Sequence, residues 1–221
     1  MKSYSNIGEI LDFLEELRQN NDRVWFKERK DRYDALRKPW ERDIERLIAL
    51  VGEFDDNVRG LQVKDSVYRI YRDIRFSHDK SPYKTYFSAV LARGGRHTVQ
   101  PGYYLHFEPG KLMLCGGIWW PAKEILAQLR SLIDAEPEEF TKIVSNPELT
   151  ARYTWESDSL KKMPADYPKD HALAQFIKMK EYIMTMHVGP DYYDCDDWVE
   201  RVAGDLRPLK PLHDFLAYVF D

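Results

Sequence analysis

Hydrophobic residues near the start of the chain recur at helical spacing. Five of them share one face: Ile7, Ile10, Leu11, Leu14 and Leu17. Asn6 followed by Glu9 resembles a capping box, so we expect a first amphipathic helix to begin there. Asp22 can cap a second helix, and Pro39 is expected to end or kink it before a third helix. Residues 1–60 are therefore predicted to be helical.

The spacing changes from that of a helix to that of a strand after residue 61. The residue types over 65–76 follow the period of two that is typical of a strand, which predicts a strand with Ile70, Arg72 and Ile74 on one face. A loop at 77–82 is expected to reverse the chain into a second strand at 83–92. Residues 103–120 are predicted to form a hairpin that turns at 108–110, where Pro and Gly favour a turn.

The last hundred residues return mostly to helical patterns. Helices are expected from Pro121, from Pro137 and over residues 170–180, and a further strand over 182–188. Residues 146–169 contain three prolines and scattered charges, which predicts a connection with little regular structure. Two more helices are expected, around 192–203 and 208–220.

This order of elements predicts an α+β fold. We expect an antiparallel sheet of four to six strands, with N-terminal and C-terminal helices packed on it. The length is compatible with a single domain over residues 1–221. Its predicted parts are a helical section at 1–60, the sheet core at 61–120, and helices with one further strand at 121–221.

Composition excludes several classes of protein. Hydrophobic residues make up 43% of the chain and aromatic residues 14%, values that exclude disorder. The start lacks the apolar segment of a signal peptide and no apolar run could span a bilayer, so we expect a cytoplasmic protein without membrane contact. Cys115 and Cys195 lie far apart, and the six histidines are dispersed, so neither a disulfide framework nor a metal site is predicted. No motif for a cofactor is present.

Charge is distributed unevenly along the chain. The net charge of −4 argues against a nucleic-acid partner, since general nucleic-acid binders are strongly basic. Residues 61–100 nevertheless carry eight Lys or Arg against three Asp or Glu, whereas residues 181–221 carry three against nine. Either the two segments face each other in the fold, or the basic one serves an anionic partner.

Three long motifs carry a family resemblance. They are NNDRVWFKERKDRY at 20–33, YRIYRDIRFSHDKSPYKTYF at 68–87 and PGYYLHFEPGKLMLCGGIWWP at 101–121. With them, the chain resembles the bacterial family called domain of unknown function 2461 over most of its length. The resemblance implies no established activity, substrate or cofactor. His78 stands where a lysine is expected in the central motif, which removes a full positive charge at neutral pH.

The central motif has two interpretations, which turn on what meets Arg72. A guanidinium that points toward apolar neighbours is costly unless it is paired. Its partner is either a carboxylate of the same chain, in a structural ion-pair network, or an external phosphate or carboxylate. The internal candidates are Asp73, Asp79, Glu108 or an acid of the C-terminal segment.

For an external anion, the motif predicts a set of ligand-binding residues. Guanidinium forks, ammonium groups and the backbone N–H groups of the loop are all suited to an anion. The predicted substrate-binding residues are Arg69, Arg72, Arg75, Ser77, Lys80, Tyr83 and Lys84. Arg23 and Trp25 would form a further wall if their helix packs beside the loop.

Two residues are predicted to carry protons. These are His106 and Asp79, since Asp73 shares its strand face with Arg69 and Arg75, which would lower its pKa. The sequence thus leaves two functions open. One is an enzyme that acts on a small anionic metabolite, and the other is a non-catalytic module that binds a protein or nucleic-acid partner. It gives no indication of oligomeric state.

Overall fold

One antiparallel sheet of five strands forms the centre of the molecule. The computed structural model describes residues 5–220 and has an α+β fold, which confirms the predicted fold class and sheet size. In spatial order the strands are β1 (Phe87–Leu91), β2 (Gly102–Glu108), β3 (Lys111–Ile118), β5 (Tyr182–Val188) and β4 (Thr154–Trp155). Of the predicted domain 1–221, residues 1–4 and 221 lie outside the described part.

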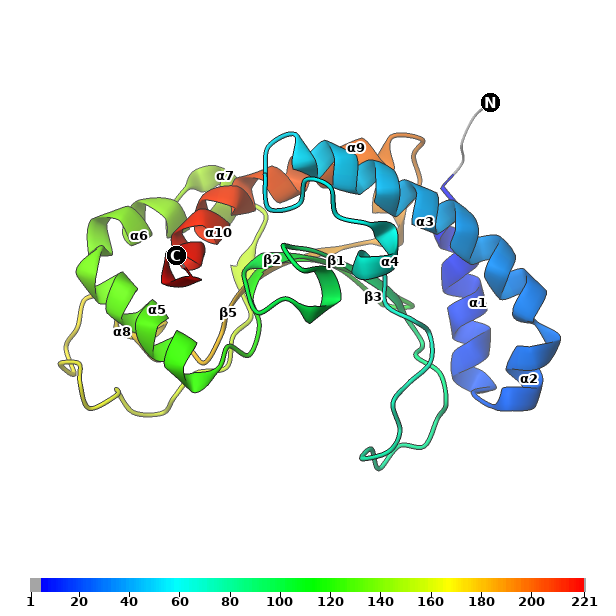
Figure 1. Cartoon of the computed structure of the whole chain (residues 1–221), viewed down its shortest axis with the longest axis horizontal. Coiled ribbons are helices and arrows are strands. Elements are labelled where there is room, and N and C mark those ends of the chain that lie inside the picture. The colour runs from blue at the N-terminus through cyan, green and yellow to red at the C-terminus, as the bar shows by residue number, and fades with distance from the viewer. Residues whose placement is uncertain (1–4, 221) are drawn as a thin grey trace.

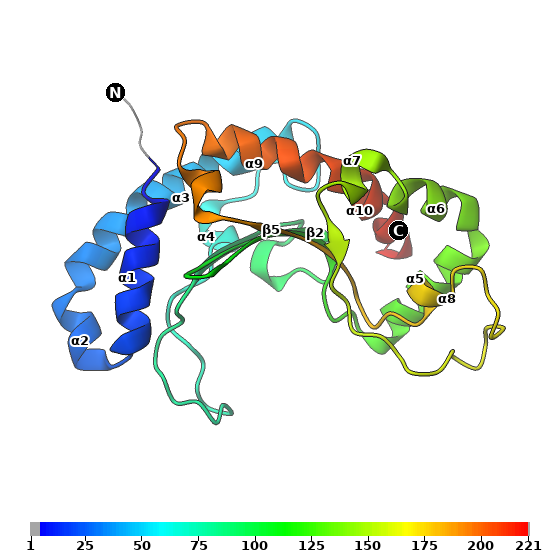
Figure 2. The same ribbon diagram turned by 180° about the vertical axis from the view of Figure 1, so that it is seen from behind.

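Two helices cover one face of this sheet. Helices α3 (Lys30–Gly52) and α9 (Trp198–Leu206) run side by side above it in both ribbon views (Figure 1, Figure 2). The Trp40 ring of α3 lies 5.1 Å from that of Phe87 and 5.8 Å from that of Phe107. Trp198 of α9 lies 6.2 Å from Phe107. Aromatic packing between these helices and the sheet therefore forms the main core.

The N-terminal helices are α1 (Ile7–Gln19), α2 (Arg23–Glu28) and α3. Asp22 caps α2 as predicted, because its side chain accepts from the backbone N–H groups of Val24 and Trp25. The predicted capping box at Asn6 is wrong, since the Asn6 amide donates instead to the Leu36 carbonyl, 2.8 Å away.

Pro39 was expected to end or kink a helix, but it lies inside the continuous helix α3. A proline inside a helix costs about 3 kcal/mol. Leu36, Trp40 and Ile44 are all buried on the side that meets the rest of the molecule. We infer that burial of apolar side chains on both sides of Pro39 outweighs the lost backbone hydrogen bond.

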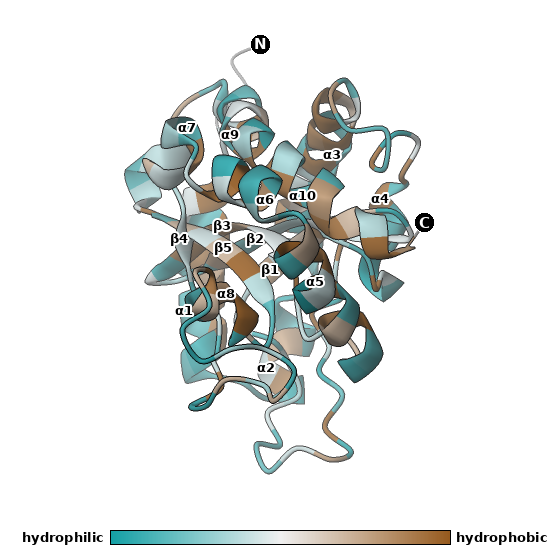
Figure 3. Cartoon of the chain, turned by 90° about the vertical axis from the view of Figure 1, so that its left-hand side faces the viewer, coloured by the Kyte–Doolittle hydropathy of each residue, from teal (hydrophilic) through white to brown (hydrophobic). Residues whose placement is uncertain are grey.

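Five further helices gather at the opposite end of the sheet from α1 and α2 (Figure 1). They are α5 (Lys123–Ala135), α6 (Pro137–Val144), α7 (Pro147–Thr150), α8 (Ala174–Ile177) and α10 (Lys210–Ala217). The Phe140 ring of α6 packs 4.9 Å from Phe176 of α8 and 5.3 Å from Phe215 of α10. Hydrophobic and hydrophilic segments alternate along these helices in Figure 3, as expected for helices with one buried side.

Several predicted boundaries in this half are confirmed and others move. The start of α6 at Pro137 and the whole of β5 agree with the prediction, whereas α9 begins at Trp198 rather than near 192. A short 3-10 helix, Pro190–Tyr193, precedes α9. The predicted irregular connection at 146–169 contains α7 and β4. Strand β4 has only two residues, too few to show an alternating pattern.

The predicted strand over 65–76 is wrong. Residues Val63–Ser66 form the short helix α4, and residues 67–86, which we call the arm, leave the sheet as two extended segments joined at their tip (Figure 1). Isolated bridges pair Val67 with Ala89 and Tyr71 with Tyr83. The second predicted strand is correspondingly short, since β1 starts only at Phe87. The predicted turn after Glu108 is confirmed, with Gly110 at a φ of 77°.

Candidate functional site

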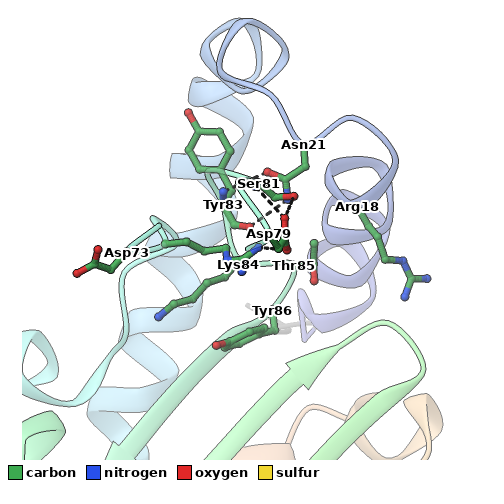
Figure 4. Close-up of a pocket in the computed structure, with 10 residues that line it drawn as sticks. Arg18, Asn21, Asp73, Asp79, Ser81, Tyr83, Lys84, Thr85 and Tyr86 are labelled. Atoms are coloured by element: carbon green, nitrogen blue, oxygen red, sulfur yellow. Dashed lines mark hydrogen bonds and ion pairs between the residues drawn. The ribbon is translucent and has the colours of Figure 1, made fainter. Parts of the chain in front are cut away.

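A cleft of about 580 Å³ lies where the arm passes the end of α1. We call it the arm cleft, and Figure 4 shows its wall. The residues that line it are Arg18, Asn21, Arg72, Asp73, Asp79, Ser81, Tyr83, Lys84, Thr85 and Tyr86. All but Arg18 and Asn21 belong to the arm.

Asn21 fastens the arm to the end of α1. Its side-chain amide donates to the Tyr83 carbonyl at 3.0 Å, and its side-chain oxygen accepts from the Tyr83 N–H at 3.1 Å. These are the two hydrogen bonds that a neighbouring strand would make. The Tyr83 ring also stacks on Phe26 of α2, with 4.0 Å between ring centroids. The arm is therefore anchored at its second segment, close to the cleft.

Arg72 is paired within its own chain. Its guanidinium forms an ion pair with Asp79 and lies 3.4 Å from the Ser77 hydroxyl. The expectation that Arg72 points toward apolar neighbours is wrong, because the arm does not continue as a flat strand. Asp79 also accepts from the Ser81 hydroxyl at 2.6 Å and from the Ser81 N–H at 2.9 Å. The Ser81 hydroxyl and Arg72 hold the pKa of Asp79 well below its usual range.

The tip of the arm contains a second internal ion pair. Arg75 pairs with Asp73 at 2.5 Å, and this contact lowers the pKa of Asp73 to about 2, as its position beside Arg75 led us to expect. Lys80 donates to the Ile74 carbonyl at 3.0 Å. For Arg72 and Arg75, these contacts agree with the structural interpretation of the motif.

Lys84 has no such partner among residues 5–220. Its ammonium nitrogen lies 5.0 Å from the ring centroid of Tyr68 and 5.7 Å from that of Tyr86. The side chain is half-buried in the wall of the arm cleft. Burial lowers the pKa of Lys84, and the guanidinium groups of Arg69, Arg96 and Arg37 lower it further.

These guanidinium groups come from three different elements. Arg37 of α3 is neutralised by Glu41, 2.7 Å away. Arg96 lies in the 3-10 helix Gly95–His97, and it donates to the Val67 carbonyl at 2.8 Å. Neither Arg96 nor Arg69 of the arm pairs with a carboxylate in the described part of the chain. We call Lys84, Arg69 and Arg96 the cation cluster, because they share positive charge without an internal counter-ion.

His106 lies behind the cleft wall, on β2. One ring nitrogen is 3.0 Å from the Tyr104 hydroxyl, and the other is 3.0 Å from the Glu108 carboxylate. The Tyr86 ring, which lines the cleft, lies 4.6 Å from the His106 ring. Burial lowers the pKa of His106, so the imidazole is neutral at pH 7.

The structure brings only part of the predicted site together. Arg72, Tyr83, Lys84 and Asp79 line the arm cleft, while the predicted binding residues outside its wall are Arg69, Arg75, Ser77 and Lys80. Glu108, a candidate partner of Arg72, instead accepts from the Thr85 hydroxyl at 3.2 Å. The roles predicted for all these residues stay predictions.

Six residues of the cleft wall are not among the site residues predicted from the sequence. They are Arg18, Asn21, Asp73, Ser81, Thr85 and Tyr86. Thr85 and Tyr86 directly follow Lys84, so their place in the same motif was an available signal. Asn21 lies in the first family motif, two residues before Arg23. From this motif Asn21 lines the cleft, whereas Arg23 and Trp25 do not.

Residues 5–220 contain neither a group of side chains suited to a metal ion nor a helix suited to spanning a membrane. No three His, Cys, Asp or Glu side chains of this range are grouped in a way that could hold a metal ion. Over the same range, no helix combines the length and apolar character needed to cross a membrane.

The fold and site define a class of protein: an α+β scaffold with a projecting basic arm and a tyrosine-lined cleft at its base. Residues 9–215 match the family model described as "Conserved hypothetical protein (DUF2461)". The chain belongs to this family, as its motifs indicated. A search of the curated proteins and a search of the solved structures each gave no match.

Proposed function

We propose that the arm cleft binds a small ligand that carries a phosphate or carboxylate group, with this group at Lys84, the member of the cation cluster that lines the cleft. One observation carries the proposal: Lys84 is half-buried in the cleft wall without a carboxylate partner among residues 5–220, and burial, together with three guanidinium groups, lowers its pKa. Like charges gathered in a partly desolvated place raise the free energy of the protein. A bound anion would lower it, and guanidinium groups match phosphate and carboxylate geometrically.

The size and charge of the molecule favour a small ligand over a polymer. A volume of about 580 Å³ is within the range of ordinary small-molecule sites. A net charge of −4 disfavours a long polyanion, whose binding is driven by many cationic contacts.

The proposal concerns binding, and turnover is a separate prediction. Asp79 is a poor proton carrier near neutral pH, because the Ser81 hydroxyl and Arg72 keep its pKa low. His106 is neutral, and its ring packs against Tyr86 in the cleft wall, so it is the better base of the two. Catalysis would need the Tyr86 side chain to turn and admit a substrate to His106.

The test is a thermal-shift titration with inorganic phosphate, phosphate monoesters and small carboxylates at matched ionic strength. A ligand at a hundred times its dissociation constant adds about 2.7 kcal/mol, which raises the Tm of a chain of this size by roughly 5–10 °C. We expect this shift in the wild type and in Lys142→Gln, an exposed control on α6. Lys84→Gln should lose it.

The same variants separate ligand binding from a structural role. Without ligand, Lys84→Gln should be at least as stable as the wild type, because it removes a positive charge from the cation cluster. A large drop in Tm for ligand-free Lys84→Gln, together with no shift of the wild type by any compound, would overturn the proposal.

A further inference from the structure

We propose that Lys84 is a nucleophilic amine that forms an imine with a ligand bearing both an aldehyde or ketone and a phosphate or carboxylate. This inference rests on the proposed function, because the anionic group is what brings the carbonyl to Lys84. It goes beyond binding, since it assigns a covalent step and narrows the ligand to anionic carbonyl compounds.

The surroundings of Lys84 leave its nitrogen free to react. Other lysines of the chain have a carboxylate partner, as in the ion pairs of Lys30 with Asp34 and of Lys210 with Asp214. Among residues 5–220 no carboxylate pairs with Lys84; the faces of two tyrosine rings lie near its nitrogen, and its side chain lines the cleft. Figure 4 shows it extending beside Tyr86 at the base of the cleft. A free amine is the reactive form in imine chemistry.

The carboxylates of the cleft are already engaged. Asp79 pairs with Arg72 and accepts from Ser81, and Asp73 pairs with Arg75. Neither therefore neutralises Lys84, which is consistent with the downward direction of its pKa shift.

The arginines around Lys84 can have a different role from Lys84 itself. A guanidinium group keeps its charge at every physiological pH, so Arg69 and Arg96 add a positive field beside the cleft whether or not Lys84 carries its proton. Arg37 adds to the field, although Glu41 largely balances it. Lysine next to other cationic groups is one of the known arrangements that favours the neutral amine.

The covalent step needs no redox partner. The Lys84 nitrogen attacks the carbonyl carbon, a C–N bond forms, and the carbonyl oxygen takes up a proton to give a carbinolamine. The C–O bond then breaks, the oxygen leaves as water after a second protonation, and the nitrogen loses its remaining protons to give the imine. The rings of Tyr68 and Tyr86 flank Lys84, and burial raises the pKa of both phenols, so both hydroxyls stay protonated.

The experiment traps the imine. The full chain is incubated with glyceraldehyde 3-phosphate and sodium cyanoborohydride, which reduces an imine to a stable secondary amine, and the modified lysines are located by peptide mass spectrometry. We expect modification at Lys84 to be at least about tenfold faster than at Lys142, because the cation cluster concentrates the anion. Unphosphorylated glyceraldehyde should lose most of this preference, and inorganic phosphate should protect Lys84. Lys84→Arg should give no adduct at position 84.

The outcomes separate this inference from the proposed function. If phosphate raises the Tm of the wild type but not of Lys84→Gln, and labelling is equal at all exposed lysines, the imine is overturned and binding stands. If phosphate has no effect on Tm and both aldehydes modify Lys84 at the same rate, both proposals are overturned.

Discussion

At the scale of single residues, His213 of α10 is buried against the sheet with neither ring nitrogen hydrogen-bonded to a described residue. Its ring lies 4.3 Å from that of Tyr103, and a Cβ at Gly116 would come within 2.9 Å of its Nε2. Glycine at 116 therefore makes room for the imidazole. Burial lowers the pKa of His213 to about 3, so it stays neutral in the folded protein.

This burial predicts a loss of stability in acid. Below pH ~6.5 the unfolded chain takes up a proton at His213, whereas the folded chain does not until near pH 3. Between these values the free energy of unfolding should fall by up to about 1.4 kcal/mol per pH unit from this residue alone. In urea unfolding, the free energy of unfolding of His213→Leu should change less steeply with pH between pH 7 and pH 4 than that of the wild type. The difference in slope should correspond to about one proton.

The control for this measurement is His97→Gln, since His97 is exposed. It should keep the slope of the wild type. If His213→Leu also keeps that slope, His213 takes up its proton in the folded state and the argument from burial fails.

Local residue chemistry could be predicted only where the partner is close in sequence. The cap of α2 at Asp22 was predictable, because donor and acceptor are two and three residues apart. Asn6 also had the composition of a cap, but its amide finds Leu36, thirty residues away. In the same way, the low pKa of Asp73 follows from neighbours in sequence, whereas Lys84 meets Arg37 and Arg96 only in the folded chain.

At the scale of elements, the arm shows which structural features an alternating pattern of residue types does and does not predict. Residues 67–72 are extended, and Val67 and Ile70 are buried, so an extended segment was a sound inference. The inference that this segment belongs to the sheet was not sound, because a strand of a sheet needs a continuous ladder of backbone hydrogen bonds to its neighbour. The backbone N–H of Arg72 donates to the Pro82 carbonyl, but Pro82 has no N–H that could donate back to Arg72. The β2–β3 hairpin, by contrast, was predictable from Pro109-Gly110 between two apolar runs.

The attachment of the arm to α1 gives a prediction at this scale. Asn21→Ala removes both hydrogen bonds to Tyr83 and should lower the free energy of unfolding by about 1–2 kcal/mol. Asn20→Ala is the matched control, because the Asn20 amide donates only to the Glu16 carbonyl of its own helix. Its effect should stay below about 0.5 kcal/mol. Urea unfolding of both variants checks this, and equal losses would show that the Asn21 contacts do not secure the arm.

At the scale of the whole molecule, the core joins parts that are far apart in sequence. Trp40 from the N-terminal helices and Trp198 from the C-terminal ones both pack on Phe107 of the sheet. An ion pair between Arg46 and Glu200 links α3 to α9 on the surface. Most of the buried apolar residues in the described part of the chain form one cluster that extends from Ile7 to Leu216.

A continuous core predicts that the chain unfolds as a single cooperative unit. Urea unfolding followed by tryptophan fluorescence, and by far-ultraviolet circular dichroism, should give coincident transitions with one midpoint. Two transitions, or midpoints that differ between the two probes, would show that the helical N-terminal part and the remainder are separate domains.

Eight of the ten residues that line the arm cleft lie within the continuous stretch 72–86, and the five strands contribute none of them. The codons for these eight residues therefore lie in one short part of the gene, separate from the codons for the sheet and for the helices that cover it. A gene library confined to this part can be selected for altered ligand preference while the codons of the sheet and of the helices that cover it stay unchanged.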